Sequence, residues 1–294
     1  MIKTPTTELR QLLAETHELP VLPQVAIQLG ELTAGSGASS IDIERTVSAD
    51  PGMAAKVLAL ANSAYYGMPK RISSLREAVM FLGPQALREL VADCHNFTRF
   101  MGKSDTLSLA RRGVWRHSLE TASCARFLTT RIPAAQDCFT PEEAQTAGLL
   151  HDVGITLLDR QRHETYVMIV ERAAADNRRF SDVEAEYLPF GHGLAAAAMA
   201  NRWNFPAPLC EAIAFHHTPR AAEVNPRLCS LIWLADQAAH FVDSSRTGTA
   251  SPEEFRTHFE DVLVPLRLDL GSVLSLVGQC RSEVDQDLAR LSLR

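Results

Sequence analysis

The sequence lacks the features that define several large classes of protein. Aromatic residues make up only 6% of its 294 residues, and none of its six cysteines forms a C-x-x-C pair. Without that spacing, a zinc finger or a thioredoxin-type redox site is not indicated. The longest apolar run, Leu194 to Ala200, is far shorter than the roughly 20 residues that cross a bilayer. We therefore expect no membrane span and no membrane partner.

Positive charge is not in excess either. Lys and Arg number 29 against 35 Asp and Glu, which gives a formal net charge of -6. Proteins that cover phosphate backbones usually carry the opposite balance. The basic pairs Lys70-Arg71 and Arg111-Arg112 are short, and no recognition-helix pattern accompanies them. The sequence therefore gives little support to nucleic acid as a partner.

The N-terminal residues do not resemble an export signal. Lys3, Glu8 and Arg10 stand where a secretory signal would have an apolar core. We therefore expect a cytoplasmic protein whose cysteines stay reduced.

Signals for helix starts and stops are frequent. Asp50-Pro51 combines an N-cap with proline at the first helical position, and Gly83-Pro84 predicts the end of one helix and the start of the next. Four segments fit the capping-box pattern: Ser74 to Glu77, Thr140 to Glu143, Ser181 to Glu184 and Ser251 to Glu254. No segment shows the sustained alternation typical of strands. The sequence predicts an all-α fold.

Two polar segments suggest boundaries between groups of helices. Gly102 to Asp105 follows an N-terminal helical block, and Asp243 to Ser251 is predicted to be a linker or exposed loop. Beyond it, Phe255, Phe259 and Leu263 recur at helical spacing and predict an amphipathic C-terminal extension that docks on the body. The predicted units are a lead (1–14), an N-terminal bundle (15–102), a second helical half (103–242), and the linker with C-terminal helices (243–294).

The residues that could bind a metal ion or take part in catalysis lie in the second helical half. They are His117, His151, Asp152, His192, His216, His217 and Asp236. All fall at helix ends or on apolar helices, where an ionisable side chain needs a partner. Taken singly, each is more typical of a packed histidine or a solvated aspartate. Taken together, imidazoles and carboxylates in this number suit one or two ions of zinc, iron, manganese or nickel. Spacing alone does not show that they converge.

His117, His151-Asp152 and Asp236 resemble the H…HD…D signature of the HD superfamily of metal-dependent phosphohydrolases, and Ala147 to Gly154 (AGLLHDVG) is the most specific piece. The resemblance implies a first ion held by His117, His151, Asp152 and Asp236. It implies a second ion that shares Asp152 and takes His192 with one or both of His216 and His217. The implied cofactors are one or two divalent transition-metal ions: iron, manganese or zinc.

The N-terminal block narrows the resemblance. Five runs are similar to the hallmark sequence of HDOD domains, the HD-related output domains of bacterial signalling: Leu19 to Pro23, Ser48 to Pro51, Leu60 to Ser63, Tyr65 to Gly67 and Phe81 to Gly83. Trp115 to Ser118 and Trp203 to Pro206 extend the similarity, which covers about residues 15 to 240. It implies an N-terminal helical bundle packed on an HD-like helical half. It also implies a regulatory role through a protein signalling partner.

The sequence departs in three places from relatives that hydrolyse cyclic di-GMP. Thr218-Pro219-Arg220 replaces their Gly-Tyr-Pro, Ile155 replaces a lysine, and Gly113 replaces a glutamate. Because a cyclic dinucleotide needs cations to meet its phosphates, we expect a regulatory protein without this activity. The alternative is a metal-dependent phosphohydrolase that takes a nucleotide or other phosphoester as ligand. No catalytic residue is assigned.

Overall fold

The computed structural model describes residues 7–16, 19–35, 38–94, 105–247 and 262–291. Across these ranges the chain is helical and contains no strand, so the predicted all-α class is confirmed. Among the same residues, no helix combines the length and the apolar character needed to cross a membrane.

Most helices are short and follow one another closely. The N-terminal ones are α1 (Thr7–Glu15), α2 (Pro23–Ala34), α3 (Ser40–Ser48), α4 (Pro51–Ala61) and α5 (Leu75–Cys94). The central ones are α6 (Asp105–Arg131), α7 (Pro133–Gln136), α8 (Pro141–Leu150), α9 (Val153–Gln161), α10 (His163–Asp176), α11 (Phe180–Tyr187), α12 (His192–Arg202), α13 (Ala207–Phe215) and the 3₁₀ turn η2 (Pro219–Ala221). The last are α14 (Pro226–Thr247) and α16 (Leu270–Leu291).

Local capping chemistry explains several helix boundaries. The Asp50 carboxylate accepts the backbone N–H of Gly52 and Met53 at the start of α4, and also the N–H of Leu22 just before α2. Thr140 and Glu143 form the complete capping box that begins α8. Gly83 has a φ of 67°, which interrupts the helical path of α5 immediately before Pro84. These three predicted boundaries are confirmed.

The predicted capping box from Ser181 to Glu184 is wrong. Helix α11 begins at Phe180, with Arg179 as its N-cap residue, so Ser181 lies inside the helix. The Glu184 side chain does not reach back to the helix start, because it is buried against Tyr166 and His192. A tertiary contact has taken the carboxylate that the local pattern assigned to a cap.

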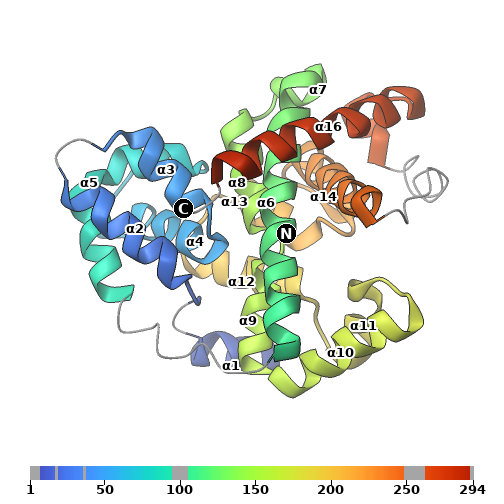
Figure 1. The fold of residues 1–294 in the computed structure, drawn as a ribbon, viewed down its shortest axis with the longest axis horizontal. Coiled ribbons are helices and arrows are strands. Elements are labelled where there is room, and N and C mark those ends of the chain that lie inside the picture. Colours follow the sequence, from blue (N-terminus) through green and yellow to red (C-terminus); the bar gives the residue numbers. More distant parts are fainter. Residues whose placement is uncertain (1–6, 17–18, 36–37, 95–104, 248–261, 292–294) are drawn as a thin grey trace.

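Helix α6 runs through the centre of the molecule, with the N-terminal helices α2 to α5 to one side of it and α14 to the other (Figure 1). It packs against α8, α14 and α16. Helices α9, α12 and α13 form a second packed group, since α12 contacts both of the others. Helices α2 to α5 pack mainly among themselves, with α5 against α2, α3 and α4, whereas α1 packs against α12.

Hydrogen bonds join the N-terminal helices to the rest of the chain. The Leu75 N–H donates to the Thr146 hydroxyl at 2.9 Å, and the Trp115 indole N–H donates to the Ala49 carbonyl at 2.8 Å. The buried apolar side chains of both parts also belong to one hydrophobic core. The predicted boundary at residue 102 lies outside the described residues, so the division into units stays a prediction.

The predicted linker is partly wrong. Helix α14 continues to Thr247, so the first half of the segment from Asp243 to Ser251 is helical. Ser, Arg and Thr are less unfavourable in a helix than Gly, and the first Gly of this segment is residue 248. Phe255, Phe259 and the Ser251 to Glu254 capping box lie outside the described residues. Leu263 is buried, and α16 packs against α6 and α14.

Replacing Thr146 with valine is expected to destabilise both sides of this contact together. The change leaves the buried Leu75 N–H without an acceptor, which costs about 1–3 kcal/mol of the free energy of unfolding. All three tryptophans lie after residue 102, so urea unfolding followed by fluorescence reports on that part, while hydrogen exchange of α4 and α5 reports on the other. The free energies of unfolding obtained from the two measurements should fall by the same amount.

The control is Thr130→Val, because the Thr130 hydroxyl donates only within its own helix, to the Phe127 carbonyl. That variant should unfold close to the wild type. If Thr146→Val lowered the free energy of unfolding measured by tryptophan fluorescence but left hydrogen exchange in α4 and α5 unchanged, the two parts would unfold independently.

Candidate metal centre

The structure brings all seven predicted site residues together. They form two adjacent groups, within each of which the ligand atoms lie no more than 4.8 Å apart. The first group comprises His117, His151 and Asp236, and the second comprises Asp152, His192, His216 and His217. We refer to these seven residues as the His/Asp cluster.

Helix ends supply most of the cluster. His151 and Asp152 lie at the junction of α8 and α9, His192 is the first residue of α12, and His216-His217 follow the end of α13. His117 and Asp236 come from within α6 and α14. Five separate segments therefore meet at one point.

Two glycines permit this convergence. A Cβ at Gly154 would lie 2.0 Å from the His192 carbonyl oxygen, so only glycine lets α9 approach the start of α12. A Cβ at Gly193 would lie 3.0 Å from the Ile213 carbonyl oxygen, at the contact of α12 with α13. Close backbone packing therefore sets the distance of His192 from its partners.

Asp152 lies between the two groups. Its Oδ2 is 3.3 Å from His151 Nε2 and 3.9 Å from His117 Nε2. Its Oδ1 is 3.1 Å from His192 Nε2 and 3.4 Å from His216 Nε2. Each carboxylate oxygen thus faces a different group, as a carboxylate that bridges two cations must.

Backbone carbonyls fix the orientation of two histidines. His151 Nδ1 donates to the Gly148 carbonyl at 2.7 Å, and His216 Nδ1 donates to the Ile213 carbonyl at 2.8 Å. Because a carbonyl oxygen only accepts, the proton of each neutral ring is on Nδ1. The Nε2 lone pairs are therefore directed at the interior of the cluster.

His192 Nε2 lies 3.2 Å from the Nε2 atoms of both His216 and His217. Nitrogen lone pairs at this distance repel each other unless a proton or a metal ion lies between them. A proton or a metal ion between these nitrogens would relieve the repulsion, so the geometry of the second group suits a bound cation.

Glu184 is a site residue that the sequence did not reveal. Its Oε2 accepts the backbone N–H of His192 at 3.0 Å and the ring Nδ1–H at 2.8 Å. Its other oxygen accepts the hydroxyl of the buried Tyr166. A carboxylate that holds Nδ1 of a metal-binding histidine fixes the ring and makes Nε2 more basic.

His240 is a second residue that was missed. Its ring stacks on His117 with centroids 4.3 Å apart, and its Nε2 lies 3.3 Å from Asp236 Oδ1. The spacing of four residues from Asp236 on one helix was a readable signal for this contact. The His240 side chain is 63% exposed, so it stands at the solvent edge of the cluster.

The carboxylates of the cluster are held ionised. Burial by itself would raise the pKa of Asp152, but the charge of His151 and the nearby rings of His192 and His216 bring it well below its usual value. Burial opposes ionisation of Asp236 as well, yet His240 and His117 hold its pKa well below the usual value.

The histidines differ in their protonation. Burial disfavours charge on His192, but the neighbouring carboxylates of Asp152 and Glu184 prevail and raise its pKa to about 10. The same two opposing effects raise the pKa of His151, where Asp152 is the main partner. Burial, with the neighbouring histidines, lowers the pKa of His216. The cluster therefore favours positive charge in its centre.

The donor atoms fit a transition-metal ion. His151 Nε2 and Asp152 Oδ1 are buried and have no hydrogen-bond partner among the described residues. Leaving such an atom unsatisfied costs about 1–3 kcal/mol, and coordination would satisfy both. Imidazole nitrogens combined with carboxylate oxygens suit zinc, iron and manganese.

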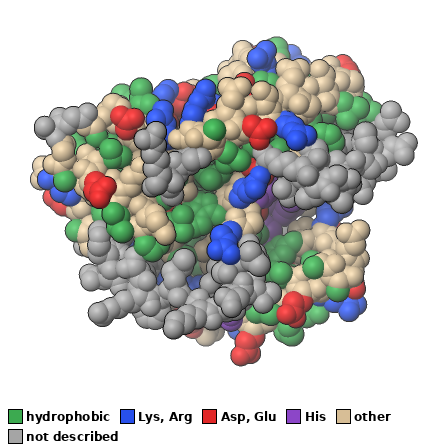
Figure 2. Space-filling view, viewed as in Figure 1, with side chains coloured by type: hydrophobic (Ala, Val, Ile, Leu, Met, Phe, Trp, Pro, Cys, Tyr) green, Lys and Arg blue, Asp and Glu red, His purple; other side chains and the backbone are tan. Residues whose placement is uncertain are grey.

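The cluster reaches the molecular surface. Figure 2 shows histidine side chains within a recess of the visible face, with Lys and Arg side chains beside it. Of the seven residues, His117 is partly exposed and His217 is exposed, whereas the other five are buried. An ion or a small ligand can therefore reach the cluster past His117 and His217.

Comparison with known proteins agrees with the fold. The family model for the HDOD domain matches residues 19–219. This match covers more than half of the chain, and the chain belongs to the HDOD family.

Solved structures share the fold. The MmoQ response regulator of Methylococcus capsulatus superposes with a TM-score of 0.65 at 19% identity, over 88% of this chain and 98% of that chain. A virulence factor of Campylobacter jejuni superposes with a TM-score of 0.64 at 19% identity, over 95% of this chain and 97% of that chain. An HDOD domain protein of unknown function from Geobacter sulfurreducens superposes with a TM-score of 0.54 at 22% identity, over 96% of this chain and 97% of that chain.

A curated relative extends beyond this chain. An uncharacterized protein of Treponema pallidum is 27% identical over 260 residues, which are 88% of this chain and 49% of the relative. The chain thus spans about half the length of that relative.

Proposed function

We propose that this chain is a regulatory HDOD protein whose His/Asp cluster binds one or two divalent transition-metal ions and which acts through contacts with a protein signalling partner. The observation that carries metal binding is the arrangement around Asp152. Its two oxygens face two sets of histidine Nε2 atoms, and backbone carbonyls direct two of those lone pairs inward.

The two groups define which residues would hold each ion. The first ion would take His117, His151 and Asp236, the second would take His192, His216 and His217, and Asp152 would bridge them. A bound ion of this kind acts as a Lewis acid and lowers the pKa of bound water. Glu184 fixes the ring of His192 through its Nδ1, so the protein supplies orientation as well as ligands.

Regulation is favoured over catalysis by what surrounds the cluster. Ile155 lies on α9, three residues after Asp152, where relatives that hydrolyse cyclic di-GMP carry a lysine. An isoleucine cannot neutralise a phosphate group. The similarity in fold to a response regulator agrees with a signalling role.

Metal binding is expected to raise the thermal stability of the protein. Protein freed of metal with a chelator should unfold at a higher temperature after addition of manganese, iron(II) or zinc. When the free metal concentration is 100 times the dissociation constant, the free energy of unfolding rises by about 2.7 kcal/mol. Calcium, which prefers oxygen-only sites, serves as the control. If all four ions raised the unfolding temperature equally, a site built from imidazoles would be contradicted.

The second candidate is a metal-dependent phosphohydrolase, which the bridging Asp152 and the exposed edge of the cluster favour. We expect the metal-loaded protein to leave cyclic di-GMP intact, because Ile155 and Thr218-Pro219-Arg220 supply no matched set of phosphate contacts. Incubation followed by chromatography of the nucleotides measures this directly. Conversion to the linear dinucleotide or GMP that disappears in His151→Ala would establish the enzyme instead, and a screen of other nucleotides and phosphomonoesters extends the same test.

A further inference from the structure

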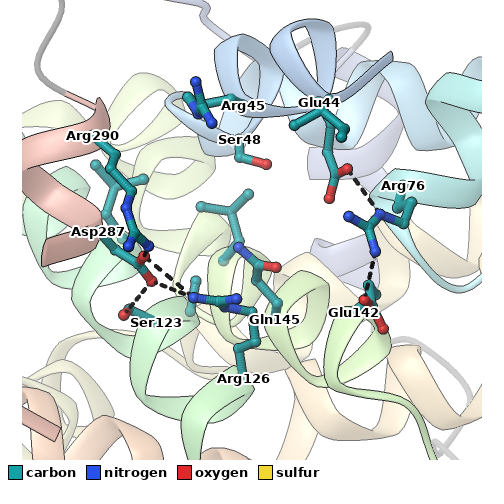
Figure 3. A pocket seen from close by; sticks show the side chains of 14 residues that line it. Glu44, Arg45, Ser48, Arg76, Ser123, Arg126, Glu142, Gln145, Asp287 and Arg290 are labelled. Atoms are coloured by element: carbon teal, nitrogen blue, oxygen red, sulfur yellow. Dashed lines mark hydrogen bonds and ion pairs between the residues drawn. The ribbon is translucent and has the colours of Figure 1, made fainter. Parts of the chain in front are cut away.

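A cleft lies where the N-terminal helices, the central helices and the C-terminal helix meet (Figure 3). Residues of α3, α5, α6, α8 and α16 line it, and its volume is about 180 Å³. None of the residues that line it belongs to the His/Asp cluster.

Charge is distributed unevenly along this cleft. At one end the Asp287 carboxylate accepts from Arg126 at 2.9 Å and from Arg290 at 3.0 Å. At the other end Arg76 donates to Glu44 at 3.1 Å and to Glu142 at 2.9 Å. Two arginines therefore share one carboxylate beside α16, whereas one arginine is shared by two carboxylates beside α8. The end beside α16 attracts anions.

Donors remain at the positive end. Arg126 Nε is buried and has no hydrogen-bond partner among the described residues, so Asp287 does not use all the donors of this guanidinium. Arg45 of α3 lines the cleft and faces Asp42 at 3.7 Å, with both side chains about half exposed. A pair of this kind contributes little to stability, so Arg45 can turn to a ligand at small cost. Ser48 and Gln145 lie between Arg45 and Arg126 and add neutral polar groups (Figure 3).

Apolar side chains complete the wall. Leu119 and Ala122 of α6 and Leu149 of α8 line the cleft between its charged ends. A few polar groups at fixed places beside an apolar surface are typical of small-molecule sites. Guanidinium groups recognise carboxylate and phosphate groups through paired N–H donors.

We propose that this cleft binds a small organic anion, with its phosphate or carboxylate group between Arg45 and Arg126 and its apolar body against Leu119. An anion held there joins α3 to α6, and so links the N-terminal helices to the helix that carries His117. This site would give the protein a small-molecule input that does not depend on the metal proposal.

Isothermal titration of the full chain at low ionic strength tests the site. Phenyl phosphate and benzoate carry the two anionic groups on the same ring, and benzyl alcohol is the neutral control. We expect at least one anion to bind and benzyl alcohol not to bind. Arg45→Gln should weaken the binding at least tenfold. The matched control is Arg172→Gln, since Arg172 is an exposed arginine of α10 that pairs with Asp176 at 2.7 Å.

Asp152→Asn separates this site from the metal centre, to which an anion could also bind. Binding that survives in Asp152→Asn and in Arg172→Gln but is weakened in Arg45→Gln supports the proposal. Binding lost in Asp152→Asn and unchanged in Arg45→Gln would place the anion at the His/Asp cluster and overturn it. Absence of binding by both anions to the wild type would also overturn it.

Discussion

Replacing Asp152 with asparagine is expected to abolish the binding of both metal ions. The Asp152 carboxylate is the only group that faces both sets of histidines in the described cluster, with one oxygen directed to each. Asparagine has the same size, but it has one oxygen in place of two and no charge. The thermal stabilisation by metal, about 2.7 kcal/mol at 100 times the wild-type dissociation constant, should therefore disappear. Differential scanning calorimetry with and without manganese measures the difference.

Asp176→Asn is the matched control for this variant, because Asp176 is an aspartate of α10 that pairs with Arg172 away from the cluster. It should keep the full response to metal. If Asp152→Asn lost the effect of one ion and kept that of another, the two groups would bind metal independently, and the bridging role of Asp152 would be refuted.

Replacing Glu184 with alanine is expected to cost about 3–5 kcal/mol of the free energy of unfolding, the range measured when one partner of a buried charged pair is removed. The change removes an acceptor from the Tyr166 hydroxyl and from two N–H groups of His192, all of them buried. Urea unfolding of the metal-free protein measures this loss.

Glu184→Gln distinguishes a positioning role from a purely structural one. Glutamine fills the same space, so this variant should fold, while the loss of the negative charge makes His192 Nε2 a weaker ligand. We expect metal affinity to fall about 10- to 100-fold, measured by competition with a chromogenic chelator. Wild-type affinity in the folded Glu184→Gln protein would limit Glu184 to a structural role.

The sequence predicted most reliably what depends on neighbouring residues. Asp50, Gly83 and the Thr140 to Glu143 capping box act within one or two turns, so their patterns identified helix boundaries correctly. The same pattern failed at Ser181 to Glu184, because the partners of Glu184 are supplied by α10 and α12. A local motif does not show which tertiary contact will compete for its side chain.

The composition of the candidate site came from a family resemblance, and its geometry came only from the structure. His117 and Asp236 are 119 residues apart and yet 2.8 Å from each other, a contact that no periodicity in the sequence predicts. The cleft beside Arg45 and Arg126 is a stronger example, since its walls come from five helices that share no motif. Such sites depend on how helices pack, which the pattern of each helix alone does not specify.

Elemental analysis of the wild-type chain, purified without chelators, is the decisive measurement of metal binding by the His/Asp cluster. We expect at least one equivalent of iron, manganese or zinc per chain, retained after gel filtration and absent from Asp152→Asn prepared in the same way. A wild-type protein without bound transition metal, or an Asp152→Asn variant with the same metal content as the wild type, would contradict it.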